Sequence, residues 1–139
     1  MATYNSDAVN TGLMATPYGA GQVVCRTGEY TVGDSALDSG SVLALVPIPA
    51  GAKLLMIEYS FSALGTSRVA DIGDTDDADR YANDVDVSSA VTGAINCVNH
   101  DYDDDDTIQV TVSGGTIPAA AVVKINAYYK MKDMIEDEA

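Results

Sequence analysis

Apolar and polar side chains alternate at every second position along several stretches of this chain, and that period restricts the possible folds strongly. The alternation is clearest in Lys53–Ser62, Thr107–Val112 and Val122–Met131. A period of two places successive side chains on opposite faces of an extended strand, so that one face is buried and the other meets water. Apolar residues at helical spacing are hard to find. The three stretches therefore predict half-buried antiparallel β-strands.

Shorter stretches carry a weaker form of the same pattern. They are Gln22–Cys25, Glu29–Val32, Ser41–Val46, Arg68–Ile72, Tyr81–Val87 and Ile95–His100. Between them stand Gly-Asp, Ser-Gly and Pro-Ala-Gly segments, which favour turns. Short strands with turn signals about every 8–12 residues are typical of sandwiches and barrels. We predict an all-β fold: an antiparallel β-sandwich of about eight strands, jelly-roll-like, with an extended N-terminal arm.

The composition divides the chain into three segments. Its 139 residues match one domain, large enough to build a core without a metal or a disulfide. Residues 1–21 show no period and are expected to form the extended arm. Residues 22–131 are expected to form the sandwich, and residues 132–139 a short acidic tail. The first residues lack the features of a secretory signal, so we expect cytoplasmic synthesis and two reduced, buried thiols at Cys25 and Cys97.

The charge balance is strongly acidic and excludes several classes of partner. Seven basic residues stand against 21 acidic ones, for a formal net charge of −14 at pH 7. Affinity for nucleic acid comes from Lys and Arg, so no nucleic acid is expected as a partner, and no anionic membrane for the same reason. No apolar run approaches the roughly 20 residues that span a bilayer. Apolar residues make up 47% of the chain, which excludes a disordered protein.

Most of the acidic residues fall in three clusters, Asp71–Asp86, Asp101–Asp106 and Asp133–Glu138. Crowded carboxylates repel one another unless they are solvated, paired or held by a cation. Solvated surface loops are the first interpretation. A calcium site is the second, although the spacing around Asp74 lacks the glycine and the distal glutamate of an EF-hand loop. A catalytic carboxylate pair is the third.

No motif typical of an active site accompanies these carboxylates. His100 is the single histidine, which excludes two-histidine zinc sites, and we expect it at a strand end or on the surface beside Asp101. Neither a Gly-x-Ser-x-Gly elbow nor a Gly-Lys-Ser phosphate loop is present. We therefore expect no enzyme activity, no cofactor and no bound metal.

The tyrosines indicate where a partner could bind. Tyr4 and Tyr18 lie on the predicted arm, which has no core of its own to bury them. Tyrosine is enriched at protein interfaces, so both are candidate contacts to a partner, although they could instead fold back on this domain. Val42–Val46 is apolar on both faces, as a central strand or a subunit contact requires. A homo-oligomer would explain the second face.

Two short motifs follow one another in a suggestive order. The first is Leu45-Val46-Pro47-Ile48-Pro49-Ala50-Gly51-Ala52-Lys53, and the second is Gly73-Asp74-Thr75-Asp76-Asp77-Ala78-Asp79-Arg80-Tyr81. Over roughly Glu29 to Tyr129 the chain resembles the capsid decoration, or cement, proteins and related small structural proteins of tailed-phage virions. The resemblance implies a jelly-roll-like sandwich that trimerises on the capsid exterior, binds the major capsid protein and reaches over capsid subunits with its arm. It also implies synthesis in the host cytoplasm. The long Asp-rich stretches depart from the family pattern and leave metal involvement open.

Asp79, Arg80 and Tyr81 form the part of the second motif that we expect to fix the loop. An ion pair within the loop would hold Arg80 before Tyr81 enters the next strand. Two other functions remain open from the sequence. One is a calcium-dependent carbohydrate-binding sandwich with Asp ligands and tyrosine platforms for sugars. The other is a head–tail or tail component of a virion.

Overall fold

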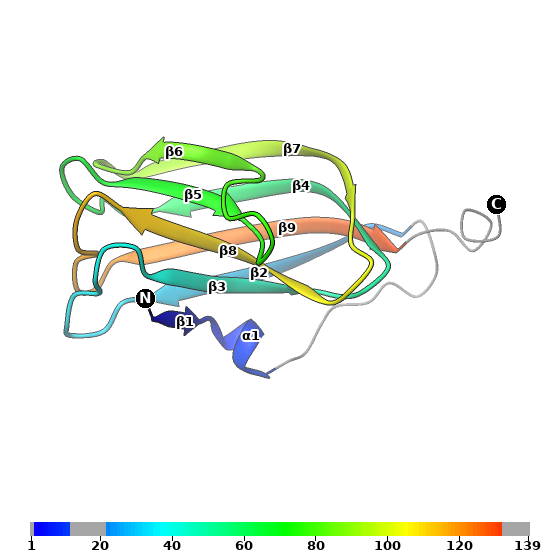
Figure 1. Ribbon diagram of the computed structural model, residues 1–139, viewed down its shortest axis with the longest axis horizontal. Helices are drawn as coiled ribbons and strands as arrows, with labels where there is room; N and C mark the ends of the chain where they lie inside the picture. The colour runs from blue at the N-terminus through cyan, green and yellow to red at the C-terminus, as the bar shows by residue number, and fades with distance from the viewer. Residues whose placement is uncertain (1, 12–21, 132–139) are drawn as a thin grey trace.

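The computed structural model describes residues 2–11 and 22–131, and most of this part of the chain is β-strand (Figure 1). The elements follow in the order β1 (Thr3–Asn5), α1 (Asp7–Thr11), β2 (Val24–Thr31), β3 (Val42–Ile48), β4 (Ala52–Phe61), β5 (Val69–Gly73), β6 (Ala82–Asp86), β7 (Val91–Asp101), β8 (Asp106–Ser113) and β9 (Val122–Met131). Within this part of the chain, no helix has the length and the apolar character that a bilayer span requires.

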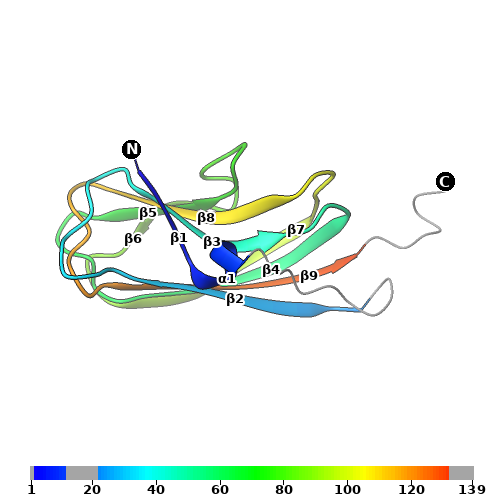
Figure 2. The same cartoon turned by 90° about the horizontal axis from the view of Figure 1, so that it is seen from below.

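Two sheets pack face to face as the layers of a sandwich (Figure 2). Sheet A has the strand order β1-β3-β8-β5-β6, and sheet B has the order β2-β9-β4-β7. Strands β2 to β9 pair like one long hairpin that has been rolled up: β2 with β9, β3 with β8, β4 with β7, and β5 with β6. All of these pairs are antiparallel, which gives a jelly-roll-like sandwich. The predicted all-β antiparallel sandwich is confirmed.

The three clearest alternating stretches form the middle strands of the two sheets. Strand β9 has the predicted bounds, and β4 and β8 differ from theirs by single residues at the ends. Their alternate side chains point between the sheets, where burial of apolar surface stabilises the fold. The fully buried members include Leu54, Ile57, Ile108, Val110, Val112, Val123, Ile125 and Tyr129.

Strand β2 joins two stretches that the sequence predicts as separate strands, Gln22–Cys25 and Glu29–Val32. Gly28 lies between them and suggests a break. In the structure it is buried in mid-strand, where a Cβ would lie 1.9 Å from the carbonyl oxygen of Leu45 on β3. The missing side chain therefore lets β2 of sheet B approach β3 of sheet A closely, which closes one side of the sandwich.

Strand β3 contains Val42–Val46, and the chain itself covers both of its faces. The pairing of β3 with β8 shifts between Ala44 and Val46, so Leu45 is the extra residue of a β-bulge. Leu45 and Val46 are both fully buried. Because β1, α1 and β2 pack beside β3, the second apolar face does not require another subunit.

The first described residues dock on the domain. Strand β1 pairs in parallel with Val42–Ala44 of β3. Residues 3–11 of the predicted extended arm are thus a short strand and a single helical turn at the edge of sheet A, seen between the two layers in Figure 2. Residues 12–21, the rest of the predicted arm, and the predicted acidic tail, 132–139, lie outside the described residues.

Ser6 connects β1 to α1 and is itself buried. Its side chain accepts a hydrogen bond from the backbone nitrogen of Val9 at 3.3 Å, as a helix N-cap does. The same hydroxyl donates to the carbonyl oxygen of Leu45, the bulge residue. One side chain therefore caps α1 and supplies a partner for a buried carbonyl that the bulge removes from the β3–β8 pairing.

Candidate functional site

The loop that joins β5 to β6 carries the second sequence motif, and its backbone folds tightly over the end of β5. The nitrogen of Asp74 donates to the carbonyl oxygen of Asp77 at 3.0 Å, and the nitrogen of Tyr81 donates to that of Ile72 at 2.9 Å. A Cβ on Gly73 would lie 2.1 Å from the Asp77 carbonyl oxygen. Only glycine fits beneath this turn, because the Asp77 carbonyl group that a Cβ would meet belongs to the backbone and cannot rotate away as a side chain could.

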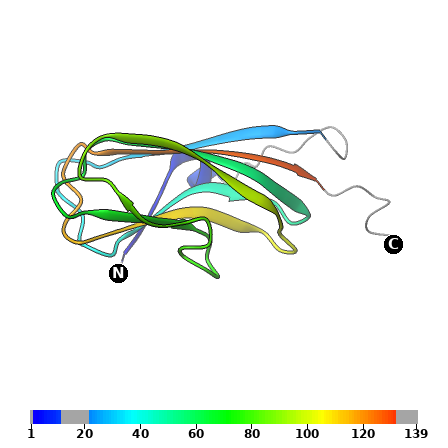
Figure 3. The ribbon, with the colours of Figure 1, turned by 90° about the horizontal axis from the view of Figure 1, so that it is seen from above.

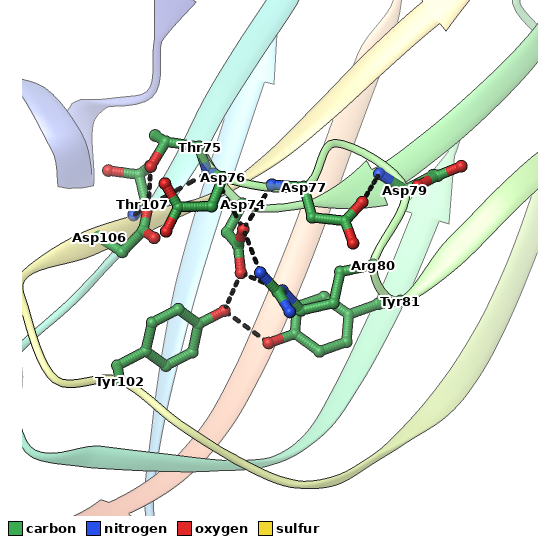
Figure 4. Close-up of polar contacts among 10 residues, drawn as sticks. All are labelled: Asp74, Thr75, Asp76, Asp77, Asp79, Arg80, Tyr81, Tyr102, Asp106 and Thr107. Carbon is green, nitrogen blue, oxygen red and sulfur yellow. Dashed lines mark hydrogen bonds and ion pairs between the residues drawn. The ribbon is translucent and has the colours of Figure 1, made fainter.

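Asp74 is the centre of a group of polar contacts in the loop (Figure 4). Its side chain is only 1% exposed. Its Oδ2 accepts hydrogen bonds from Arg80 Nε at 2.6 Å and from the Tyr102 hydroxyl at 2.8 Å. Its Oδ1 accepts from the backbone nitrogens of Asp76 and Asp77 at 3.2 and 3.0 Å, with Arg80 Nη2 at 3.4 Å. Five donors thus surround one carboxylate.

Tyr102 reaches Asp74 from the loop between β7 and β8, and its hydroxyl also contacts that of Tyr81. Since its own proton is directed at Asp74, Tyr102 accepts a hydrogen bond from the Tyr81 hydroxyl, at 2.5 Å. The ring of His100 lies edge-on to both tyrosines, with centroids 4.9 Å from Tyr102 and 6.1 Å from Tyr81. These contacts join the two acidic loops at one end of the sandwich.

The surroundings of Asp74 keep it ionised. Burial alone would raise its pKa, but the hydrogen bonds from Arg80, Tyr102 and the Asp77 backbone outweigh that effect and lower the pKa below its ordinary value. The hydrogen bond to Asp74 in turn raises the pKa of Arg80. Burial, followed by the hydrogen bond with Tyr81, raises the pKa of Tyr102, which keeps that phenol protonated. Asp74 and Arg80 are therefore a charged carboxylate and a charged guanidinium at neutral pH.

The second acidic loop also uses its carboxylates as hydrogen-bond acceptors. Asp106 Oδ1 accepts from the Thr75 hydroxyl at 2.8 Å and from the Thr75 backbone nitrogen at 3.2 Å. Asp105 Oδ1 accepts from the backbone nitrogen of Ala50 at 2.7 Å. Carboxylates of both clusters thus hold loop backbones in place, in addition to charging the surface.

A pocket of about 250 Å³ lies between the two loops, with acidic side chains of both on its walls beside Arg80 and His100. The buried carboxylate there, that of Asp74, already accepts five hydrogen bonds and has no open position for a substrate proton. Within residues 2–11 and 22–131, no three His, Cys, Asp or Glu side chains are grouped so that they could hold a metal ion. The geometry fits a rigid acidic loop pair better than a reaction centre.

The predicted loop-fixing residues divide into two groups. Arg80 and Tyr81 take part in the buried network, and the partner of Arg80 is Asp74. Asp79 is exposed, and its backbone nitrogen donates to Asp77 Oδ1 at 3.3 Å. The pKa of Asp79 is raised by its hydrogen bond with the Asp77 carboxyl and by the like charge there. Asp79 therefore carries charge on the loop surface without holding Arg80.

The two candidate contact tyrosines also differ in what the structure says of them. Tyr4 packs against Tyr30 of β2, with ring centroids 5.9 Å apart, so it contributes to docking of β1. Tyr18 lies outside the described residues. Of the two cysteines, Cys97 is buried as expected, and burial raises the pKa of its thiol to about 12. Cys25 is exposed, contrary to expectation, because it points outward from the edge strand β2.

Sequence reasoning missed two residues of the network. The sequence predicts Asp74 as a motif residue and a candidate calcium ligand, not as the partner of Arg80, and it assigns no role to Tyr102. An available signal was the position of Tyr102, a large amphipathic ring between two runs of aspartate that must bury its ring and pair its hydroxyl. Sequence reasoning also missed Ser6, between β1 and α1, where the sequence Ser-Asp before Ala8-Val9 is a helix start signal.

Comparisons with known proteins find similarity in structure alone. No protein-family model and no curated protein matches the sequence. A chain in the capsid of Ralstonia phage GP4 has a TM-score of 0.79 at 16% identity, over 93% of this chain and 97% of that one. The chain shares a fold with phage capsid proteins. A chain of the cyanophage Pam1 capsid asymmetric unit has a TM-score of 0.69 at 17% identity, over 86% and 92% of the two chains. A chain in the acidic stable capsid of Helicobacter pylori bacteriophage KHP30 has a TM-score of 0.57 at 14% identity, over 81% and 90%.

Proposed function

We propose that this protein is a structural component of a phage virion that decorates the exterior of the assembled capsid. It binds the major capsid protein lattice as a homotrimer and stabilises the head. The observation that carries this proposal is the fold match with the GP4 capsid chain, which extends over nearly the full length of both chains. The match spans 93% of this chain and 97% of that one, so the fold of this chain corresponds to that of a whole chain in a capsid.

The site geometry supports a structural role. The Asp74–Arg80–Tyr102 network satisfies its own charges and hydrogen bonds, so its contribution is rigidity of the acidic loops. A protein that binds only the assembled lattice stabilises that lattice by mass action, in proportion to its concentration relative to Kd. Three linked copies bind with avidity, so that modest contacts per copy suffice. Neither effect requires an active site.

Co-sedimentation with purified phage shells that lack this protein tests the proposal. We expect the protein to pellet with assembled shells in a fixed ratio to the capsid protein, and to raise the temperature at which the shells disrupt. It should not bind unassembled capsid subunits. Equal binding to subunits and shells, or no binding to either, would contradict the decoration role. If imaging of the native particle shows the protein on the tail, the protein is a tail component and the decoration role is wrong.

The arm can be tested with a matched pair of tyrosine variants. Tyr18→Ala is expected to weaken shell binding while the melting temperature of the free protein stays unchanged. Tyr4→Ala is expected to lower the melting temperature, because Tyr4 packs on Tyr30 within the same chain. If Tyr18→Ala pellets with shells at the wild-type affinity, Tyr18 is not a shell contact.

A further inference from the structure

The outward side chains of sheet B form a surface of their own. The outer face of sheet B consists of Lys124, Asn126, Tyr128 and Lys130 of β9, their paired residues on β2 and β4, and the residues of β7 paired beyond β4. These positions alternate with the buried core positions of the same strands. Within the described residues, this is the side of the molecule opposite sheet A (Figure 3).

The charges on this face compensate one another. Its lysines are Lys53, Lys124 and Lys130, and its carboxylates are Glu29, Glu58 and Asp101, so the face is formally neutral. Lys53 Nζ lies 3.9 Å from Asp101 Oδ1, and Glu29 is the direct cross-strand neighbour of Lys124. Opposite charges at such positions attract one another weakly.

Glu58 is held by its neighbours on β9. Its Oε1 accepts hydrogen bonds from the Tyr128 hydroxyl at 2.6 Å and from Asn126 Nδ2 at 3.3 Å. Asn126 in turn accepts from the Thr27 hydroxyl at 2.6 Å. The hydrogen bond to Glu58 raises the pKa of Tyr128, which stays a donor at neutral pH. The face therefore presents an ordered array of hydroxyl and amide groups.

The rest of the described surface has a very different charge. Outside this face, residues 2–11 and 22–131 hold fourteen carboxylates and three arginines. The loop between β5 and β6 projects from the side of sheet A, away from sheet B (Figure 2). The molecule thus has one neutral face, and the rest of its described surface, called the acidic side, carries the excess of carboxylates.

The neutral face has an area and a surface shape that suit contact with another protein. Four strands about 4.8 Å apart and about ten residues long at about 3.3 Å per residue cover roughly 600 Å². A stable contact buries about 800 Å² per partner, so this face would supply most of one. A shallow depression of about 480 Å³ lies across it, lined by hydrogen-bonding groups that include Ser60, Thr92 and Asn126.

We propose that the outer face of sheet B is the surface that lies against the assembled shell, and that the shell surface it meets is a protein surface of low net charge. This inference rests on the proposed function. A basic partner would be attracted to the Asp-rich loops, and a strongly acidic one would be repelled by the molecule as a whole. The neutral face requires the least desolvation of unpaired charge on contact. With this orientation the acidic side points into solvent, and neighbouring particles repel one another.

Charge insertion on this face tests the inference. Thr92 and Ala94 are exposed, point outward on the edge strand β7, and lie beside the depression. Thr92→Glu with Ala94→Glu is expected to reduce shell affinity at least about 100-fold in co-sedimentation. Thr92→Lys with Ala94→Lys is expected to do the same, because an unpaired charge of either sign must lose its water. The matched control adds two glutamates on the acidic side, Ala36→Glu with Ala78→Glu, and should bind like the wild type.

The exposed thiol of Cys25 gives a second readout on the same face. Shell binding is expected to slow maleimide labelling of Cys25 at least about tenfold, and Cys97 stays unlabelled because it is buried. If the control variant loses affinity and the Thr92/Ala94 variants do not, the acidic side is the contact and the inference is wrong. If the variants change the mass of the free oligomer by light scattering, the face joins copies of this chain, and the inference is also wrong. Failure of the wild type to pellet with shells would instead refute the proposed function.

Discussion

Asp74 shows how a single residue can hold a loop of like charges together. It sits among seven aspartates of the first cluster, yet it alone is withdrawn from water and paired with a cation. Removing one partner of a buried ion pair leaves the other charge without compensation, which costs more than the pair itself contributes. The loop therefore depends on Arg80, and its exposed carboxylates are supported by that one pair.

Arg80→Met is expected to destabilise the protein by about 2–3 kcal/mol, less than a fully buried pair would lose because Arg80 is 28% exposed. The matched variant is Asp79→Asn, one position away in the same loop. It should leave stability unchanged or raise it slightly, because it removes repulsion with Asp77. Urea unfolding of both variants measures the difference. Equal effects of the two substitutions would show that the Asp74–Arg80 contact is not what holds the loop.

The same pair predicts how stability depends on pH. Because the pKa of Asp74 is lower in the folded protein than in the unfolded chain, the stabilisation is fully present above the unfolded value, about 3.9, and is lost as pH falls through the folded pKa. The stability difference between wild type and Arg80→Met should therefore be largest at neutral pH, where the Asp74 carboxylate that has lost Arg80 is charged. It should shrink below pH 4. A difference that stays constant down to pH 2 would mean that Asp74 is not the group responsible.

Among the elements, β1 and α1 are the ones whose placement most changes the picture drawn from sequence. They are too short to be stable alone, and their order comes from contacts with β3. Ser6 is the key residue, because it caps α1 and pairs with the Leu45 carbonyl at the bulge. Residues 3–11 of the predicted arm are thus a structural element of the domain.

Ser6→Ala is expected to cost about 1–2 kcal/mol, since it removes a helix cap and leaves a buried carbonyl without its partner. Hydrogen exchange should show the amides of β1 and α1 opening faster, while those of β4 and β9 stay protected. Asn10→Ala, on the exposed side of α1, serves as the control and should change neither. Unchanged exchange at Ser6→Ala would show that β1 and α1 dock through other contacts.

For the molecule as a whole, the uneven charge is the dominant property. Compact folding brings fourteen surplus negative charges together, and salt screens that repulsion over a Debye length of about 10 Å at 0.1 M. The melting temperature is therefore expected to rise by a few degrees between about 0.02 and 0.5 M NaCl. Asp76→Asn with Asp104→Asn should start from a higher melting temperature at low salt and rise less. A melting temperature that falls with salt would indicate that attractive ion pairs outweigh the repulsion.

The local patterns of the sequence were enough to predict the strands and the side chains that point inward from them. Alternation places Ile108, Val110 and Val112 on one side of β8 whatever lies beside them, because the period of a strand is a property of the backbone alone. The acidic loops and the glycine of the second motif were also visible, since turn chemistry acts over a few residues. The sequence also predicts an ion pair of Arg80 within its loop, without naming the partner.

The partner of Arg80 could not be predicted from the sequence, because several carboxylates lie within reach of Arg80 along the chain and only the folded loop selects Asp74. The contact of Tyr102 with Asp74 depends on which strands become neighbours, as do the approach of Gly28 to Leu45 and the separation of a neutral face from an acidic side. Sheet order is decided by the packing of the whole chain. Contacts between loops and between layers follow from that order, and a periodic pattern read along one strand does not contain it.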